Sequence, residues 1–401
     1  MVDVKKMFDP ALMSYKPPKS TPYAGWGAPG AIKLGSGVPD PQYYPWKLIA
    51  TLAEEALEKD YQRILSYGMP QGFPELRAWI AEHSEKNDVE IDPGQVLLCD
   101  GSTEAMSLVA KLLLQPGDAM VMEAPSYSGA VSVFQTCGAH VEQIPLDEEG
   151  IDIVLLEEYA KKRQNEEKPL KLVYIMPNYH NPLGTTTSVK RRKELVELAE
   201  KYEFLILEDD AYIEFIYEGK RLPSIQSFDT KGLVIYTSTF SKPLAPGLRL
   251  AWITASPEIT MALTRVKGAF NMSASHLGQA IALAYCKEGH MYEHIEKMNK
   301  VYKKKKDLML SALEEYMPEY VTWTKPSGGF FLWVEIEEGK IDGIELIQET
   351  KADVSYRPGD SFYIEEGEGL NKLRLCFTFE TEENIEKGVK ILAEGIKKLA
   401  K

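Results

Sequence analysis

Short apolar runs alternate with segments whose apolar residues recur at helical spacing through most of the chain. A short, bounded apolar run is typical of a buried strand, whereas recurrence every three to four residues predicts an amphipathic helix. We predict buried strands at residues 96–99, 119–122, 172–176, 204–207, 233–236 and 248–254. Because these strands alternate with helical segments, the pattern predicts a mostly parallel, doubly wound α/β sheet with helices on both faces.

The pattern changes toward both ends of the chain. Residues 1–33 are rich in Pro, Gly and Tyr without a period, which indicates an irregular arm. Helical spacing occurs at 47–60 and 74–84, and a long charged helix at 288–316 precedes two further predicted strands, 330–336 and 373–379. A chain of 401 residues is long for one core, so we predict more than one domain. Residues 1–45 would form an N-terminal arm and part of a small domain, 46–300 a large domain, and 301–401 a smaller α+β domain.

Composition and charge narrow the possible functions. With 44% hydrophobic and 26% charged residues the chain is globular, and no run approaches the roughly eighteen apolar residues of a membrane helix. No apolar segment follows Lys5 and Lys6, so we expect no signal peptide. A net charge of −14 disfavours nucleic-acid binding. The cysteines lack CxxC spacing, which predicts reduced thiols in a cytoplasmic protein and no zinc site: Cys99, Cys137, Cys286 and Cys376.

Two familiar motifs occur in unfavourable contexts. The GxGxxG match at 25–30 neither follows an apolar run nor opens a helical pattern, so a flexible loop is favoured over a dinucleotide site. The HxxEH match from His290 to His294 lies in a helix rich in Lys and Glu, where a solvated polar face is favoured over a zinc site. We therefore expect no metal.

Polar clusters follow four of the predicted strands. Lys242 stands among small hydroxyl residues after strand 233–236, and Asp209 and Tyr212 follow strand 204–207. Asn181 follows strand 172–176, and the polar segment 100–104 separates strand 96–99 from a helix predicted at 104–114. Alone, a loop lysine is ordinarily a solvated charge. Because parallel strands end at one edge of a sheet, however, these groups are expected to meet there.

In order along residues 34–380, the chain resembles the class I aminotransferases of pyridoxal-phosphate (PLP) fold type I. The likeness is greatest to the 2-aminoadipate and kynurenine aminotransferase branch. It is carried by GVPD at 37–40, YGMP at 67–70, GST at 101–103, EAPSYSG at 123–129, NP at 181–182, DDAY at 209–212, SK at 241–242 with Arg249, GGFF at 328–331, and Arg374.

The resemblance implies roles around the cofactor ring. Lys242 would hold PLP as a Schiff base and, once freed, carry a proton between the substrate Cα and the cofactor, which requires an amine of lowered pKa. Asp209 would pair with the pyridine nitrogen and keep the ring cationic, with Asp210 as its neighbouring rival. Asn181 and Tyr212 would hydrogen-bond the phenolic oxygen.

The resemblance also implies a phosphate site. Ser102 and Thr103 would present backbone N–H groups at a helix N-terminus, although Thr103 equally suits a helix N-cap. The hydroxyls of Thr239 and Ser241 and the guanidinium of Arg249 would complete the cup.

Four further residues take their roles from the resemblance. Tyr127 would stack on the cofactor ring. Tyr67 would reach the phosphate of a neighbouring subunit, so the active site would require a homodimer. Arg374 interrupts an apolar strand, where an unpaired charge is unfavourable. It would bind the substrate α-carboxylate. Gly37 and Asn181 would line the same substrate site.

The N-terminal arm departs from the branch, in which an arginine of that region can recognise an acidic side chain. Here the first arginine is Arg63, and the arm offers aromatic and lysine side chains instead: Tyr23, Trp26, Tyr43, Tyr44 and Trp46, with Lys16, Lys19 and Lys33. This composition favours an aromatic or large apolar substrate side chain over dedicated 2-aminoadipate specificity, with glutamate and 2-oxoglutarate as the partner pair.

The function implied is transfer of an amino group between an L-amino acid (broad, aromatic, large apolar or 2-aminoadipate-like) and a 2-oxo acid such as 2-oxoglutarate. It would proceed by a ping-pong route through an internal aldimine at Lys242. A C–S lyase or decarboxylase of the same fold would use the same Lys242 and Asp209 and remains an alternative. A non-catalytic PLP-sensing domain is disfavoured by the acidic charge and by the short segment before Gly37.

Overall fold

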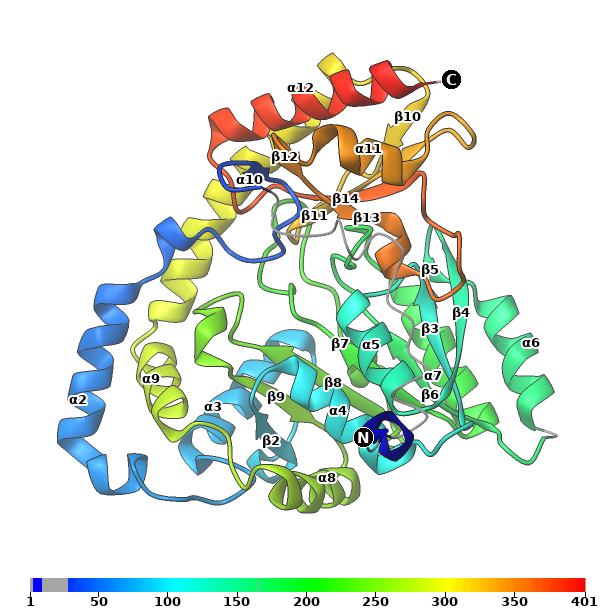
Figure 1. Ribbon diagram of the computed structural model, residues 1–401. Coiled ribbons are helices and arrows are strands. Elements are labelled where there is room, and N and C mark those ends of the chain that lie inside the picture. Colours follow the sequence, from blue (N-terminus) through cyan, green and yellow to red (C-terminus); the bar gives the residue numbers. More distant parts are fainter. Residues whose placement is uncertain (1–2, 9–27, 165, 401) are drawn as a thin grey trace.

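The computed structural model describes residues 3–8, 28–164 and 166–400, and its large domain is built around one eight-stranded sheet (Figure 1). The strand order is β2-β9-β8-β7-β6-β3-β4-β5. The strands are β2 (Val96–Cys99), β3 (Ala119–Ala124), β4 (His140–Asp147), β5 (Gly150–Ile151), β6 (Leu170–Ile175), β7 (Leu205–Asp209), β8 (Val234–Thr239) and β9 (Ala251–Thr254). Strands β4, β3, β6, β7 and β8 are parallel to their neighbours in that series, which confirms the predicted fold class.

Helices cover both faces of this sheet, because alternate residues of the buried strands point to opposite sides. Leu97 in β2 packs with α4 and α5, whereas Leu98 packs with α2, α3 and α9. Val173 in β6 packs with α6 and α7. The helices of the large domain are α2 (Trp46–Ile64), α3 (Pro74–Ser84), α4 (Ser102–Leu113), α5 (Ser128–Thr136), α6 (Ile153–Gln164), α7 (Val189–Tyr202), α8 (Pro257–Phe270) and α9 (His276–Lys287).

The last predicted strand of the large domain starts later than predicted, and it is an antiparallel member of the mostly parallel sheet. β9 begins at Ala251 instead of residue 248 and runs antiparallel to both β2 and β8. Residues 240–250 connect β8 to β9 with only a 3₁₀ helix at Pro246–Leu248, whereas a parallel pair needs a longer crossover, usually helical. β4 and its hairpin partner β5 were not predicted, because most side chains of β4 are exposed or half-buried and leave no apolar run.

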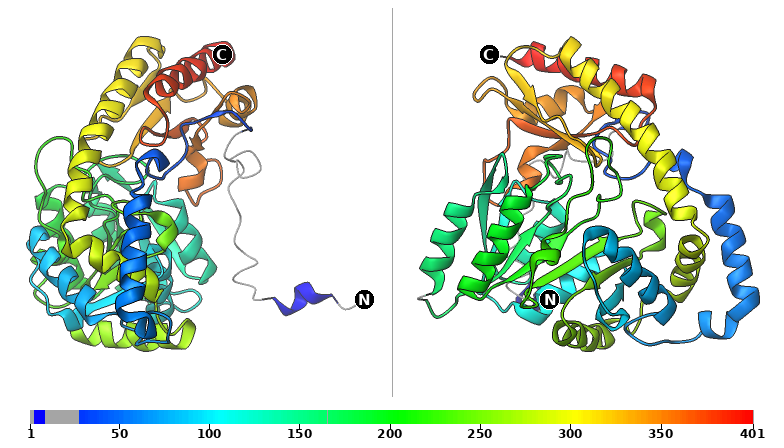
Figure 2. Two further views of the ribbon diagram at one scale, coloured as in Figure 1. Left: turned by 90° about the vertical axis from the view of Figure 1, so that its left-hand side faces the viewer. Right: turned by 180° about the vertical axis from the view of Figure 1, so that it is seen from behind.

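The small domain combines a four-stranded antiparallel sheet with helices on one side (Figure 1). Its sheet order is β10 (Val321–Trp323), β11 (Phe331–Ile336), β14 (Lys372–Cys376) and β13 (Arg357–Pro358). The long helix α10 (His290–Tyr316) connects the two domains (Figure 2), and α11 (Gly343–Thr350) and α12 (Glu382–Leu399) complete the helical layer. Strand β1 (Ile32–Lys33) pairs in parallel with β12 (Val354–Ser355), so the N-terminal segment packs on the small domain. The boundary proposed at residue 300 stays a prediction and falls within α10.

The sequence predicts neither a membrane helix nor a metal site nor a dinucleotide site. Among the residues that the structure describes, no helix is long and apolar enough to cross a membrane. Within the same residues, no group of three His, Cys, Asp or Glu side chains is arranged to hold a metal ion. His290 begins α10 and its Nε2 lies 3.2 Å from Glu288 Oε2, while burial lowers the pKa of His294 to about 4. The first half of the GxGxxG match, residues 25–27, lies outside the described residues, and so do Tyr23, Lys16 and Lys19.

Candidate active site

The predicted polar clusters lie where five strands of the large sheet end. β2, β6, β7 and β8 lead into the segments of Gly101, Asn181, Asp209 and Lys242, and β3 leads to Tyr127. Because β2 and β8 both run antiparallel to β9, β2 shares the direction of the parallel strands. All five segments therefore meet at the carboxyl edge of the sheet, facing the small domain.

Lys242 directs its amine into the interior of this edge. Its Nζ donates a hydrogen bond to the backbone oxygen of Gly37 at 3.0 Å and lies 5.4 Å from the centroid of the Tyr212 ring. Burial lowers the pKa of Lys242 to about 8, and the nearby guanidinium of Arg374 acts in the same direction. A substantial share of the amine is therefore neutral near physiological pH, as a nucleophile for a carbonyl carbon requires.

Asp209 ends β7 and is almost completely buried. Its Oδ2 accepts a 2.7 Å hydrogen bond from the Tyr174 hydroxyl, whereas its Oδ1 is buried without a hydrogen-bond partner among the described residues. Burial raises the pKa of Asp209 to about 6, although the Tyr174 hydrogen bond and the charge of Lys242 lower it. A cationic group placed against Oδ1 would offset this desolvation.

Asp210, the neighbouring rival, faces a different set of partners. Its Oδ2 accepts a 2.9 Å hydrogen bond from Asn178 Nδ2, and the buried Arg192 donates to Asn178 Oδ1. Burial also raises the pKa of Asp210, with the carboxylate of Glu208 adding to the effect. The charge of Lys242 lowers the pKa of Asp209, whereas Asp210 is held by Asn178, which in turn is held by Arg192, and this favours Asp209 as the group facing the ring.

Arg374 joins the small domain to the loop after β6. Its Nη1 donates to Asn181 Oδ1 at 2.8 Å and its Nη2 donates to the backbone oxygen of Gly35 at 2.8 Å. The guanidinium lies 4.0 Å from the centroid of the Phe331 ring, and its Nε has no hydrogen-bond partner among the described residues. Burial lowers the pKa of Arg374 to about 10. A fixed, desolvated fork of this kind binds a carboxylate in a defined orientation.

The proposed phosphate cup lies at the start of α4. Gly101 has φ +91° and occupies the N-cap without a side-chain capping bond, so the N-cap role considered for Thr103 is wrong: Ser102 and Thr103 form the first turn. A Cβ at Gly101 would lie 2.1 Å from Arg249 Nη2, so only glycine allows this approach. Uncapped N–H groups beside a guanidinium form an anion site.

The remaining hydroxyl and aromatic residues are divided between this edge and the surface. Thr239 Oγ1 donates to Ser241 Oγ at 2.9 Å, and both residues are buried. Tyr212 is buried with its ring 5.4 Å from that of Phe331, and Tyr127 precedes α5. Tyr67, by contrast, is 88% exposed. The chain alone therefore does not bring Tyr67 into the site.

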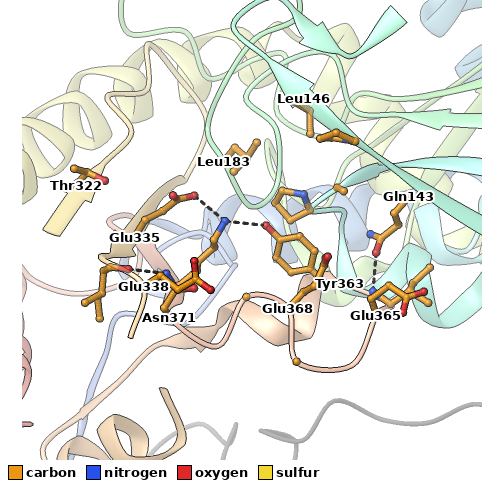
Figure 3. Close-up of a pocket in the computed structure, with 18 of the residues that line it drawn as sticks. Gln143, Leu146, Leu183, Thr322, Glu335, Glu338, Tyr363, Glu365, Glu368 and Asn371 are labelled. Carbon is orange, nitrogen blue, oxygen red and sulfur yellow. Dashed lines mark hydrogen bonds and ion pairs between the residues drawn. The ribbon is translucent and has the colours of Figure 1, made fainter. Parts of the chain in front are cut away.

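A cavity of about 290 Å³ is lined by part of these groups, whereas Asp209, Arg249 and the start of α4 are not among its lining residues. Its walls include Gly37, Tyr127, Asn181, Tyr212, Lys242, Phe331 and Arg374. A larger cavity of about 1100 Å³ lies between β4 and the small domain and contains none of the predicted site residues (Figure 3). Seven of its lining residues are glutamates, whose charge opposes binding of an anionic amino or oxo acid: Glu142, Glu319, Glu335, Glu337, Glu338, Glu365 and Glu368. The smaller cavity is therefore the candidate active site.

Sequence reasoning did not single out Tyr174, Tyr356 or Arg357. Tyr174 carries the only polar side-chain group of residues 172–175 in β6, and the need of a buried hydroxyl for a partner was an available signal. Tyr356 and Arg357 line the cavity together with Lys33 of the arm, but they stand in a short stretch without periodicity.

These features fit PLP. The unpartnered Asp209 Oδ1 suits a protonated pyridine nitrogen, the α4 N-terminus with Arg249 suits a phosphate, and the Lys242 amine suits an aldehyde. The site thus has the donors and acceptors of a PLP-dependent enzyme of fold type I.

Known proteins agree with this conclusion. The family model for aminotransferase class I and II matches residues 29–392. An aromatic-amino-acid aminotransferase 1 from Thermococcus litoralis is 40% identical over 367 residues, covering 91% of this chain and 88% of that protein. A 2-aminoadipate transaminase from Thermus thermophilus is 34% identical over 375 residues, covering 92% of this chain and 91% of that protein.

The solved structures give the same result. The crystal structure of the kynurenine aminotransferase from Pyrococcus horikoshii, in complex with PMP, has a TM-score of 0.91 and 36% identity, covering 99% of this chain and 98% of that one. The chain belongs to the class I and II aminotransferase family. It is a PLP-dependent aminotransferase of fold type I, similar to the 2-aminoadipate and kynurenine branch.

Proposed function

We propose that this enzyme transfers the amino group of an L-amino acid to a 2-oxo acid such as 2-oxoglutarate by a ping-pong route. The proposal rests on one observation: the Lys242 amine and the Arg374 guanidinium line one cavity of about 290 Å³. An amino acid has an amine and a carboxylate on the same carbon, so it presents both groups to such a site at once.

Each residue at the site would have a defined task. Bound PLP supplies a cationic ring that accepts electrons from the substrate Cα. Arg374 would orient the α-carboxylate, and Asn181 fixes the guanidinium through its 2.8 Å hydrogen bond. The Lys242 amine would move the proton at Cα, for which its pKa of about 8 is suited. Asp209 would hold the proton of the ring nitrogen through Oδ1, while Tyr174 fixes its other oxygen.

We propose that the amino donor has an aromatic or large apolar side chain, or one resembling 2-aminoadipate. Tyr127, Phe331 and Tyr356 line the cavity and offer aromatic surface to such a side chain. The names of the relatives, an aromatic-amino-acid aminotransferase and a 2-aminoadipate transaminase, support this range. Transamination by these relatives also supports this reaction over a lyase or decarboxylase.

We also propose that the enzyme works as a homodimer in which Tyr67 reaches the partner's phosphate site. Leu65, Tyr67 and Met69 are exposed beside the end of α8, where Pro70 lies against Gly268 and where Phe270 is 65% exposed. A cluster of large exposed apolar side chains is typical of a protein interface.

A cytoplasmic location is proposed from the thiols. Cys99, Cys137, Cys286 and Cys376 are all free, and three of them are buried. Proteins of reducing compartments retain cysteine in this form.

The test is spectroscopic. Purified protein with PLP is titrated with phenylalanine, leucine, kynurenine, 2-aminoadipate and glutamate singly, and the visible band is recorded before and after 2-oxoglutarate is added. Conversion by an amino acid and reversal by the oxo acid are expected. Release of ammonia without an acceptor would contradict transamination and point to a lyase. A 2-aminoadipate rate that exceeds all others by orders of magnitude would contradict the broad range.

A further inference from the structure

Two arginines face each other across neighbouring strands of the small domain. Arg357 in β13 is the direct partner of Arg374 in β14 in an antiparallel pair. Residues directly opposite in such a pair point to the same face, with Cα atoms about 4.5–5.5 Å apart. Both side chains line the cavity of about 290 Å³.

The cavity is cationic within a strongly acidic protein. Its lining includes the side chains of Lys33, Lys242, Arg357 and Arg374, and among the described residues that line it there is no carboxylate. The whole chain carries a net charge of −14. Local positive charge against this background attracts anionic substrates.

The proposed reaction assigns a role to two of these four cationic residues. Lys242 would carry the cofactor and Arg374 would bind the α-carboxylate, so Arg357 and Lys33 remain. Lys33 lies on β1 opposite Ser355, with its Nζ 5.8 Å from the centroid of the Phe379 ring. Arg357 lies closer to the reacting groups, because it stands directly opposite Arg374 in the β13–β14 pair.

We propose that Arg357 binds the distal carboxylate of a dicarboxylic substrate, the glutamate and 2-oxoglutarate pair, while Arg374 binds its α-carboxylate. The inference rests on the proposed function and specifies the substrate class of one of its two half-reactions. Two forks on adjacent strands match a short molecule with a carboxylate at each end.

The test compares acidic and neutral substrates in single half-reactions of the holoenzyme. Arg357→Met is expected to lower kcat/KM for glutamate about 10- to 100-fold, as for a lost charged hydrogen bond, and to leave phenylalanine unchanged. Arg357→Lys, which keeps the charge and loses the fork, is expected to retain part of the glutamate activity. Lys325→Met, which removes an exposed charge outside the cavity, is the matched control and should change neither substrate.

Binding provides a readout that is independent of turnover. Calorimetry of the holoenzyme is expected to show weaker binding of glutarate to Arg357→Met and unchanged binding of 3-phenylpropanoate. An equal loss of affinity for both ligands would mean that Arg357 only supports the β13 strand. No loss of affinity for either ligand would exclude Arg357 from recognition. Either result would overturn the inference. If the unaltered protein converts no amino acid, the proposed function fails, while the glutarate measurement still decides the role of Arg357.

Discussion

Replacing Asp209 with asparagine should stabilise the apoprotein while removing its activity. Burial raises the pKa of this carboxyl from 3.8 to about 6, so the folded state holds the charged form unfavourably. A pKa that is higher in the folded than in the unfolded state contributes stability at low pH, and this contribution is lost as pH rises through about 6. A pKa shift of about two units lowers the free energy of unfolding by about 3 kcal/mol at pH 8 and by about half of that at pH 5.

The assay is urea unfolding of the apoprotein at pH 5 and pH 8, with transamination measured after PLP is added. Asp209→Asn should raise the free energy of unfolding by up to about 3 kcal/mol at pH 8 and by less at pH 5. Tyr174 can still donate to the amide oxygen, so the 2.7 Å hydrogen bond is retained. Activity should fall by orders of magnitude, because a neutral amide does not keep the ring nitrogen protonated.

The control variant, Asp118→Asn, is expected to change the free energy of unfolding in the opposite direction. Although burial raises the pKa of Asp118, hydrogen bonds from Lys171 and the backbone of Gln115 lower it below its usual value. Asp118→Asn should therefore destabilise the protein to a similar extent at pH 8 and pH 5, because the stabilisation by this carboxylate is lost only as pH falls below 3.8 and through the lower folded-state pKa. Equal destabilisation by Asp209→Asn at both pH values, or full transamination by that variant, would refute the reasoning.

Three further outcomes are expected. The rate at which the apoprotein takes up PLP should rise with pH and level off above about 8, as the Lys242 amine loses its proton. Lys242→Ala should show neither this reaction nor turnover. A pH-independent rate of uptake would contradict the lowered pKa of Lys242. Arg374→Ala should raise KM for amino acids about 10- to 100-fold through loss of a charged hydrogen bond, measured by steady-state kinetics with Arg265→Ala, an exposed arginine on α8, as the control. Mixing Lys242→Ala with Tyr67→Ala subunits should restore activity, because one site of each hybrid dimer would have both residues; no rescue would place Tyr67 in its own subunit or outside catalysis.

The sequence by itself determined the fold class and the segments that build the site. Residues 172–175 of β6 form a continuous apolar run, since parallel strands covered on both faces have no solvated side. Polar residues directly after those runs indicated where Gly101, Asn181, Asp209 and Lys242 would meet, because the carboxyl ends of parallel strands share one edge. The roles of these residues came from the family resemblance and not from the pattern.

Only the tertiary structure decided which side chains face one another. Arg357 becomes a candidate for substrate recognition because β13 pairs with β14 in a register that places it opposite Arg374, and a pairing register is not encoded in a two-residue strand. The close approach of Arg249 to Gly101, the N-cap of α4, likewise joins segments that are distant in the sequence. The pKa values of Asp209 and Lys242 follow from burial, a property of the packed chain. Periodicity along a sequence reports which residues are inside, whereas contacts between distant segments depend on how the elements pack.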